Sequence, residues 1–196
     1  MAKKTHFWIP LTQKLSKRRF LSTLSAATAA LGLTKGKEAK ARSDRYDAII
    51  VGGGTAGLPA AIFGAERGGK ILIIEAAPVI GGTLFLSTGQ MSAAGTKLQK
   101  AKGIEGDSWQ SHYDDVMRIS ENTADPDILR LATQNAAGAF DWLTDNGFEV
   151  YAHHPVTGTT HEPYSHARYA WHPEGGMGIL ELLERKLQPH IDSGAV

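Results

Sequence analysis

A glycine-rich turn between two short apolar runs constrains this chain more than any other feature. The stretch from Tyr46 to Glu75 reads YDAIIVGGGTAGLPAAIFGAERGGKILIIE. Ala48–Val51 and Ile71–Ile74 have the β-branched character of buried strands, and the alanine-rich segment between them predicts a helix. Two parallel strands joined by a helix form a βαβ unit, so the sequence predicts an α/β fold with a parallel sheet.

Three glycines in this turn have the spacing of a dinucleotide-binding loop. Gly52, Gly54 and Gly57 form G-x-G-x-x-G directly after the first predicted strand. The first glycine permits the tight turn, the second lets a pyrophosphate approach the backbone, and the third lets the helix pack close to the strand. Amides and the dipole at the helix N-terminus favour the phosphate charge. Glu75 ends the second strand, where its carboxylate can accept hydrogen bonds from ribose hydroxyls.

The glycine pattern alone is a weak signal, because most matches to it are ordinary turns. Here a strand precedes it, a helix follows it and an acidic residue stands about twenty residues later, which is the context that the motif requires.

The composition excludes several classes of function. The chain has 196 residues, 42% of them hydrophobic, and a net charge of +1, so it can bury one core and carries no basic stripe for nucleic acid. It has no cysteine, which excludes disulfides, thiol catalysis and iron–sulfur ligation by this chain.

The first 41 residues have the pattern of an export signal. Met1–Arg19 is basic, and Phe20–Leu33 is mildly apolar but too short and too rich in Ser, Thr and Ala to span a bilayer. Ser16–Leu21 resembles the twin-arginine signal, with a lysine in place of the first arginine, and Ala39–Ala41 offers an A-x-A cleavage site. We therefore predict a disordered or helical twin-arginine-type signal peptide over residues 1–41 and a bacterial periplasmic protein without a stable membrane anchor. The alternative is a disordered basic tail with a chance apolar run.

The rest of the chain is predicted to be mainly helical. Pro78–Gly95 is rich in glycine and small residues and carries no charge, so it can lie close against a flat ligand. In the predicted helix that Asp125 caps, Ile128 and Leu131 belong to an apolar stripe, for which part of the partner surface is expected to be missing. The acids around Asp115 are expected to form a solvated face. Helices are predicted over Ser108–Asn122, over the segment that begins at Asp125-Pro126 and ends at Gly147, and over Gly178–His190. Short strands are predicted over Phe148–Tyr151 and at Gly194–Val196.

The order of these segments resembles that of the flavoprotein subunits of the fumarate reductase and succinate dehydrogenase family. Four blocks carry the resemblance: VGGGTAGLPAAIFGAERG, IIEAAPVIGGTLFLSTGQMSAAGT, ENTADPDILRLATQNAAGAFDWLTDNG and HPEGGMGILELLERKL. Flavocytochrome c fumarate reductases, urocanate reductases and 3-ketosteroid dehydrogenases are similar. The resemblance covers nearly all of residues 46–196. It implies a Rossmann-like FAD-binding domain and, in the intact protein, hydride transfer between flavin and an activated carbon–carbon bond of a fumarate-like or ketosteroid-like substrate. A cytochrome or a quinone-linked carrier is implied as redox partner.

The resemblance also implies which residues bind FAD. The implied contacts are Glu75 for the adenosine ribose, Gly52, Gly54, Ala56 and Gly57 for the pyrophosphate, and Gly82, Thr83, Thr88, Gly89 and Gln90 along the flavin. Members with covalent flavin carry a histidine in the segment that here reads Gly82-Thr83-Leu84, and Thr83 stands in its place. We therefore expect non-covalent FAD. Gln90 replaces a residue that is commonly glycine in the family.

In such flavoproteins, strands far downstream close the FAD domain and a separate capping domain covers it. Residues 42–196 are accordingly expected to be the N-terminal part of the FAD-binding domain, with the catalytic residues downstream and unknown. Two alternatives stay open. One is a non-catalytic truncated fragment that binds nucleotide weakly or not at all. The other is an NAD-dependent dehydrogenase, because Glu75 suits either ribose, although the Pro78–Gly95 block favours FAD.

Histidines crowd the segment before the last predicted helix, at positions 153, 154, 161, 166 and 172. Their spacing matches no compact metal-ligand pattern and cysteine is absent, so we predict no metal site. Arg168 and His172 have the chemistry to meet an anionic or carbonyl group, but structural roles are the favoured interpretation.

Overall fold

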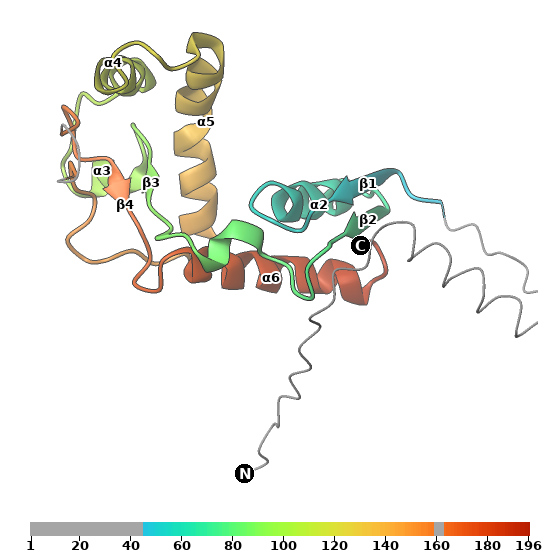
Figure 1. Ribbon diagram of the computed structural model, residues 1–196. Helices are drawn as coiled ribbons and strands as arrows, with labels where there is room; N and C mark the ends of the chain where they lie inside the picture. Colours follow the sequence, from blue (N-terminus) through green and yellow to red (C-terminus); the bar gives the residue numbers. More distant parts are fainter. Residues whose placement is uncertain (1–44, 159–162) are drawn as a thin grey trace, which may run out of the picture. The chain divides into compact units, whose positions relative to one another are not determined.

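Two parallel strands and the helix between them form the βαβ unit that the sequence predicts (Figure 1). In this computed structural model, β1 (Ala48–Val51) pairs in parallel with β2 (Ile71–Ile74), with Ala48 opposite Ile71 and Val51 opposite Ile74. Both strands have the predicted bounds. The helix α2 (Gly57–Glu66) packs on the pair. The two glycine-rich segments of the chain therefore meet at the carboxyl end of a short parallel sheet.

The structure describes residues 45–158 and 163–196. The segment predicted as a signal peptide lies outside the described residues. None of the helices in the described part of the chain is both long enough and apolar enough to cross a membrane.

The long C-terminal helix α6 (Gly176–Asp192) packs against α2 and closes the larger core cluster. Leucines dominate its buried face, with Leu182, Leu183 and Leu187 each about 2% exposed or less. After the helix, the carbonyl of Ala195 accepts a hydrogen bond of 2.7 Å from the amide of Ile71. The predicted opening of a strand at Gly194–Val196 thus lies directly beside β2.

A second group of elements surrounds a smaller core made by Ala93, Phe140 and Ala170. Its two-residue strands pair antiparallel, with Met91 opposite Ala170. The short 3₁₀ helix η1 connects β2 to this group along the chain. η1 spans Gly82–Phe85, and its Leu84 belongs to the larger core cluster. The elements of the second group are β3 (Met91–Ser92), α3 (Lys97–Ala101), α4 (Trp109–Ile119), α5 (Pro126–Asp145) and β4 (Tyr169–Ala170).

The structure corrects one predicted strand. Phe148–Tyr151 has no strand conformation. The amide of Phe148 instead bonds the carbonyl of Leu143 at 3.0 Å, which continues the turn that ends α5, and Val150 packs against both core clusters. The apolar run is therefore buried as irregular chain rather than as a ladder.

The apolar stripe of α5 is only partly buried, and the prediction of a solvated face at Asp115 on α4 was wrong. Ile128 and Leu131 of α5 are 69% and 66% exposed, whereas Phe140, further along the helix, is 4% exposed. The first turns of α5 thus lie outside the core that its later turns enter. Asp115, expected in solvent, is buried in α4 because a buried arginine pairs with it.

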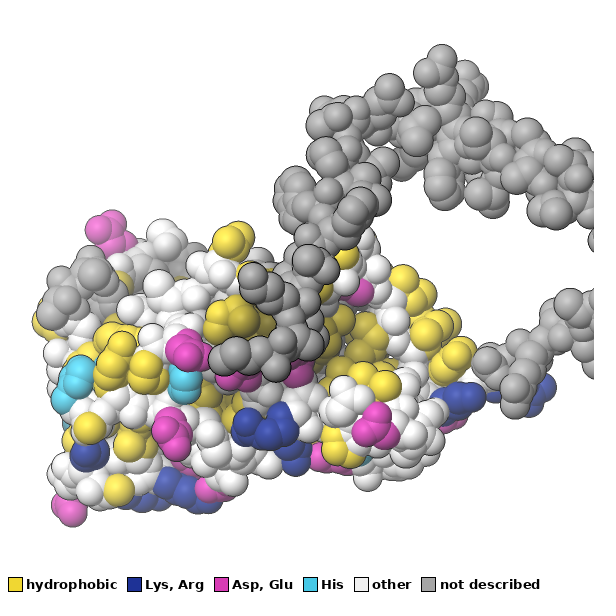
Figure 2. Space-filling model, turned by 90° about the horizontal axis from the view of Figure 1, so that it is seen from below, with side chains coloured by type: hydrophobic (Ala, Val, Ile, Leu, Met, Phe, Trp, Pro, Cys, Tyr) yellow, Lys and Arg dark blue, Asp and Glu magenta, His cyan; other side chains and the backbone are white. Residues whose placement is uncertain are grey.

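The strand pair keeps apolar surface open. Ile49 and Val51 of β1 are 60% and 84% exposed, and Ile74 of β2 is 49% exposed. In a parallel sheet, such residues are normally covered on both faces. Figure 2 shows one face of the molecule, on which hydrophobic side chains lie at the surface among charged ones.

Candidate cofactor site

The three glycines of the first turn are needed for three different physical reasons. Gly52 has a φ of +103°, which side-chain-bearing residues rarely adopt, and its amide donates to the carbonyl of Ile74 at 2.7 Å. A Cβ on Gly57 would lie 1.9 Å from the carbonyl oxygen of Gly52, so the helix starts in direct contact with the turn. A Cβ on Gly54 would find its nearest atom, Gly82 Cα, 3.9 Å away.

The backbone conformation therefore requires Gly52 and packing requires Gly57, whereas neither requires Gly54. The open space at Gly54 is what a phosphate group needs in order to reach the backbone at the start of a helix. Together with Ala56, all three glycines line a shallow hollow of about 390 Å³. The turn therefore has the shape and the backbone amide donors to bind a pyrophosphate.

Glu75 is held at the edge of this turn by two backbone amides. Its Oε2 accepts from the amide of Gly53 at 2.7 Å, and its Oε1 accepts from the amide of Ala77 at 2.8 Å. The hydrogen bond from Ala77 has the largest effect and that from Gly53 the next, and both lower the pKa of the Glu75 carboxyl below its ordinary value. The carboxylate is thus charged and fixed, and each oxygen keeps a lone pair for a hydroxyl group.

The second glycine-rich segment is tied directly to the first. The amide of Gly81 donates to the carbonyl of Gly53 at 2.7 Å. A Cβ on Gly82 would lie 3.4 Å from Gly54 Cα. This contact places η1, and with it Thr83, immediately beyond the turn. A ligand lying across Gly54 would therefore continue along η1.

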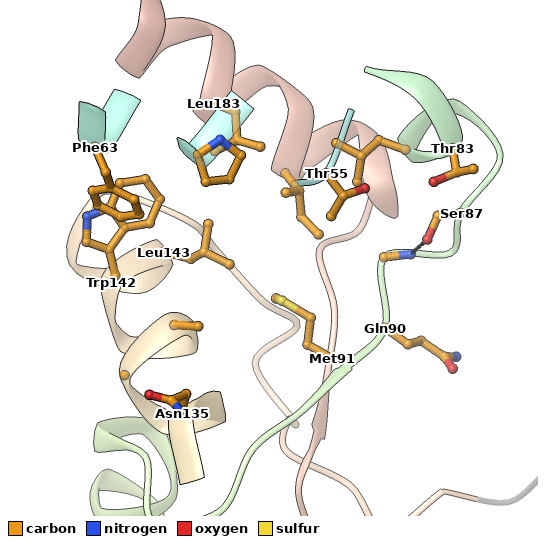
Figure 3. Close-up of a pocket in the computed structure, with 16 residues that line it drawn as sticks. Thr55, Phe63, Thr83, Ser87, Gln90, Met91, Asn135, Trp142, Leu143 and Leu183 are labelled. Atoms are coloured by element: carbon orange, nitrogen blue, oxygen red, sulfur yellow. Dashed lines mark hydrogen bonds between the residues drawn. The ribbon is translucent and has the colours of Figure 1, made fainter. Parts of the chain in front are cut away.

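A cavity of about 660 Å³ opens beyond the turn, between α2, η1, α5 and α6 (Figure 3). Its polar side chains are Thr55, Thr83 and Ser87 on one side and Asn135 on α5, whereas Gln90 lines it with its side chain extending away. The apolar wall has an edge-to-face pair of Phe63 and Trp142, with ring centroids 5.1 Å apart. A cavity with one polar and one apolar side suits a flat ligand that has a heteroatom edge and a hydrocarbon edge.

The structure brings most of the predicted cofactor residues together, but not all. Gly52, Gly54, Ala56 and Gly57 line the hollow at the turn, and Thr83, Gly89 and Gln90 line the larger cavity. Glu75, Gly82 and Thr88 line neither, and the backbone of Thr88 lies against Gly175. Thr55, Ser87 and Met91 also line the larger cavity and were not predicted, although all three lie inside the two glycine-rich segments.

Arg168 is not available to a substrate. Its side chain is fully buried, with Nε 2.9 Å from Asp107 Oδ2 and Nη1 2.5 Å from Asp115 Oδ2. Burial would raise the pKa of Asp115, but hydrogen bonds from Ser165, Arg168 and Arg118 outweigh it and hold that pKa below its ordinary value. We call Asp107, Asp115 and Arg168 the Arg168 ion network. It joins α4 to the chain before β4.

His172 and His154 both make contacts within the protein. His172 accepts from the amide of Glu174 at 3.0 Å, and its ring fills the space that a Cβ on Gly178 would need. His154 is fully buried, and its Nδ1 accepts from the amide of Trp171. His161 lies outside the described residues. Within residues 45–158 and 163–196, no three His, Cys, Asp or Glu side chains gather as metal ligands.

Comparison with known proteins agrees with this geometry. Residues 47–190 match the family model described as "FAD binding domain". The chain is 35% identical over 141 residues to the "Fumarate reductase (cytochrome)" of Shewanella frigidimarina, with 72% of this chain and 24% of that protein covered. It is 30% identical over 194 residues to the "Urocanate reductase" of Eggerthella lenta, with 89% of this chain and 30% of that protein covered.

The fold is also found among solved structures. The open conformation of a flavocytochrome c3 fumarate reductase superposes with a TM-score of 0.67 at 21% identity, covering 96% of this chain and 30% of that one. The chain thus spans less than a third of the length of these relatives. The chain belongs to the FAD-binding domain family of the fumarate reductase flavoproteins, whose members are FAD-dependent oxidoreductases.

Proposed function

We propose that this chain forms the nucleotide-binding part of a FAD-dependent oxidoreductase of the fumarate reductase type. One observation carries the proposal: a carboxylate held by backbone amides, Glu75, lies beside an open glycine, Gly54, whose surroundings lead into a cavity. Glu75 would bind the adenosine ribose and the turn would bind the pyrophosphate. The flavin would lie along Gly82–Gln90, with Thr55, Thr83 and Ser87 as its polar neighbours.

The residues of this chain would bind and orient the cofactor rather than react. The amides of the turn neutralise phosphate charge, and the apolar wall at Phe63 and Trp142 excludes water from one side of the cavity. Bound flavin supplies the hydride chemistry itself. In the intact protein, the hydride would pass between the flavin and a carbon–carbon bond beside an electron-withdrawing group. A fumarate-like acid or a ketosteroid-like ketone has such a bond.

We propose that the flavin is bound without a covalent link. Pro78–Gly95, which contains η1 and leads to β3, has no histidine, and Thr83 lies where covalent relatives are expected to carry one. Acid precipitation of the protein should therefore release all of the FAD into the supernatant. Yellow colour retained in the washed precipitate would contradict this part of the proposal.

Two further parts of the proposal rest on the sequence. Residues 1–41 would direct twin-arginine export to the periplasm and be removed, which fits a protein that binds its cofactor before export. Residues 42–196 would be the N-terminal part of the FAD domain, and a capping domain, the catalytic residues and the contacts of a redox partner would belong to the remainder of the intact protein.

The test is a titration of the 196-residue chain with FAD, ADP and NAD. Binding of all three is measured by calorimetry, and that of FAD also by flavin fluorescence. We expect FAD and ADP to bind, and Gly54→Val to abolish both while the far-ultraviolet circular dichroism is kept. Ala101→Val, at an exposed position of α3, is the control. Tight binding of NAD instead of FAD would favour the nicotinamide-dependent alternative. Binding of none of the three nucleotides would favour the non-catalytic fragment.

A further inference from the structure

One side of α5 forms the cavity wall that lies opposite the second glycine-rich segment. Asn135, Gly138, Ala139 and Trp142 all line the cavity, and their spacing of three, four and seven residues places them on the same side of the helix. We call these four residues the α5 cavity face. At 1.5 Å per residue, the face is about 10 Å long. Figure 3 shows Asn135 and Trp142 on this helix, with Thr83 across the cavity from them.

The middle of the α5 cavity face is nearly bare backbone. Beyond the neighbouring helix backbone, a Cβ on Gly138 would meet no atom within 4 Å, so packing does not require a glycine there. A glycine inside a helix also lowers stability relative to alanine. Ala139 beside it adds only a methyl group. The missing side chain therefore leaves a flat surface on which a planar ligand can lie close to the helix.

The two ends of the α5 cavity face differ in chemistry. Trp142 gives one end an aromatic ring, which packs edge-to-face with Phe63. At the other end, Nδ2 of Asn135 donates to the carbonyl of Leu131 at 2.8 Å, which orients the carboxamide. In the part of the chain that the structure describes, no other hydrogen bond engages this carboxamide, so its second N–H and its Oδ1 are available to a ligand. The face suits a ligand with a hydrocarbon body and one hydrogen-bonding group.

The cavity offers no charge to such a ligand. None of the described residues that line it is acidic or basic. Arg67 and Lys186 have their charged groups 5.8 Å from the ring centroids of Phe63 and Trp142, respectively, but neither cation lines the cavity. Arg168 is held in the Arg168 ion network. An anionic ligand would lose its hydration here without gaining a charged partner, so these walls favour a neutral compound.

We propose that the α5 cavity face binds the substrate, and that the substrate is a flat, uncharged, mostly hydrocarbon ketone rather than a dicarboxylate. The inference rests on the proposed function. With the flavin along Gly82–Gln90, a ligand on the α5 cavity face lies between the flavin and the helix. The ketone oxygen accepts a hydrogen bond from Nδ2 of Asn135, and the hydrocarbon part covers Gly138 and contacts Trp142.

The experiment uses the 196-residue chain loaded with FAD and compares two probes. 4-Androstene-3,17-dione is a flat neutral ketone with a carbon–carbon double bond beside a carbonyl, whereas fumarate is a dianion with a similarly activated double bond. Calorimetric titration measures the binding of each, and the absorbance spectrum of the bound flavin shows whether the probe lies against the ring. We expect the steroid to bind and to shift the spectrum, and fumarate to do neither at the same concentration.

Two variants of α5 locate the binding site. Gly138→Leu should weaken steroid binding about tenfold or more, because the leucine occupies the flat part of the face. Asn135→Leu should weaken it about two- to tenfold through the loss of one hydrogen bond. Gln134→Leu adds a leucine at an exposed position of α5 that does not line the cavity, and it is the control. FAD binding should be the same in all three variants, because the flavin lies against the opposite wall.

The outcomes separate this inference from the proposed function. Fumarate binding that shifts the flavin spectrum, or steroid binding that Gly138→Leu leaves unchanged, would overturn the assignment of the α5 cavity face to a neutral ketone. Binding of FAD without binding of either probe would also overturn it, while the proposed function would stand. Failure of the unmodified chain to bind FAD would overturn the proposed function and this inference with it.

Discussion

Replacing Gly54 by alanine separates a ligand-binding role from a folding role within one turn. The added Cβ would be 3.9 Å from Gly82 Cα and 4.0 Å from the carbonyl oxygen of Gly81, both ordinary contacts. Gly54 also lies outside the left-handed region that favours glycine. Without ligand, Gly54→Ala should therefore keep the free energy of unfolding or raise it by about 0.4–1 kcal/mol, since alanine restricts the unfolded chain.

The same methyl group stands where the pyrophosphate must approach the backbone. A charge-assisted hydrogen bond contributes about 1.5–3 kcal/mol, so the loss of one weakens binding by about ten- to a hundredfold. FAD and ADP should be affected alike, because they share the pyrophosphate. Urea unfolding followed by circular dichroism gives the stability, and calorimetric titration gives both dissociation constants.

Gly57→Ala is the matched contrast three residues on. Its Cβ would lie 1.9 Å from the carbonyl oxygen of Gly52, so the helix or the turn must move. We expect destabilisation of about 1–3 kcal/mol or more before any ligand is added. If Gly54→Ala binds FAD as tightly as the unmodified chain, or if it unfolds like Gly57→Ala, the assignment of Gly54 to phosphate approach is wrong.

Four other outcomes are expected. Arg168→Met should lower the free energy of unfolding, measured in urea, by about 3–5 kcal/mol, because it removes the buried cation that pairs with both Asp107 and Asp115; a loss below about 1 kcal/mol would contradict the structural role. Burial, followed by the charge of Arg168, lowers the pKa of His112 to about 4, although the charges of Asp107 and Asp115 act to raise it. Between pH 6.5 and 4, the unfolded chain therefore binds a proton at this histidine that the folded chain does not. Stability should therefore fall by up to about 3 kcal/mol as the pH drops through that window, and His112→Gln should flatten the slope in urea titrations. Glu75→Gln should weaken ADP and FAD binding by the same factor, and a loss confined to FAD would place Glu75 away from the ribose. Mass spectrometry of the exported protein should find Arg42 as the N-terminus, and replacing Arg18 and Arg19 by lysine should block export; a full-length cytoplasmic product from the unmodified gene would exclude the signal peptide.

Local chemistry explains which elements could be predicted from the sequence. β1 and β2 end where their β-branched runs meet glycine and Glu75, and both bounds were predicted. Asp125 caps α5 as expected, with its carboxylate accepting from the amides of Asp127 and Ile128 at 3.0 Å each. The capping box of α3 was also readable, as Thr96 followed three residues later by Gln99, but it was missed.

Contacts between distant segments explain what could not be predicted. Arg168 is buried because Asp107 and Asp115 come from other parts of the chain, and no spacing rule connects positions 61 and 53 residues apart. The same pairing with Arg168 explains why Asp115 is buried although it was expected to lie on a solvated face. Phe148–Tyr151 has strand-forming residues, but the turn that ends α5 takes its first amide. The polar side of the cavity lay within predicted segments, while its apolar wall from Phe63 and Trp142 depends on how α2 and α5 meet.

The Arg168 ion network also affects the order of events during synthesis. Asp107 and Asp115 leave the ribosome well before their cation, since Arg168 follows Asp115 by 53 residues. At about 5–20 residues per second, the two carboxylates wait roughly 3–10 s for it. Until then their mutual repulsion and their hydration favour an open arrangement of α4 and the loop before it. The β3–β4 ladder and the small core around Phe140 should therefore form only after Arg168 has emerged, as one late event in the folding of the nascent chain.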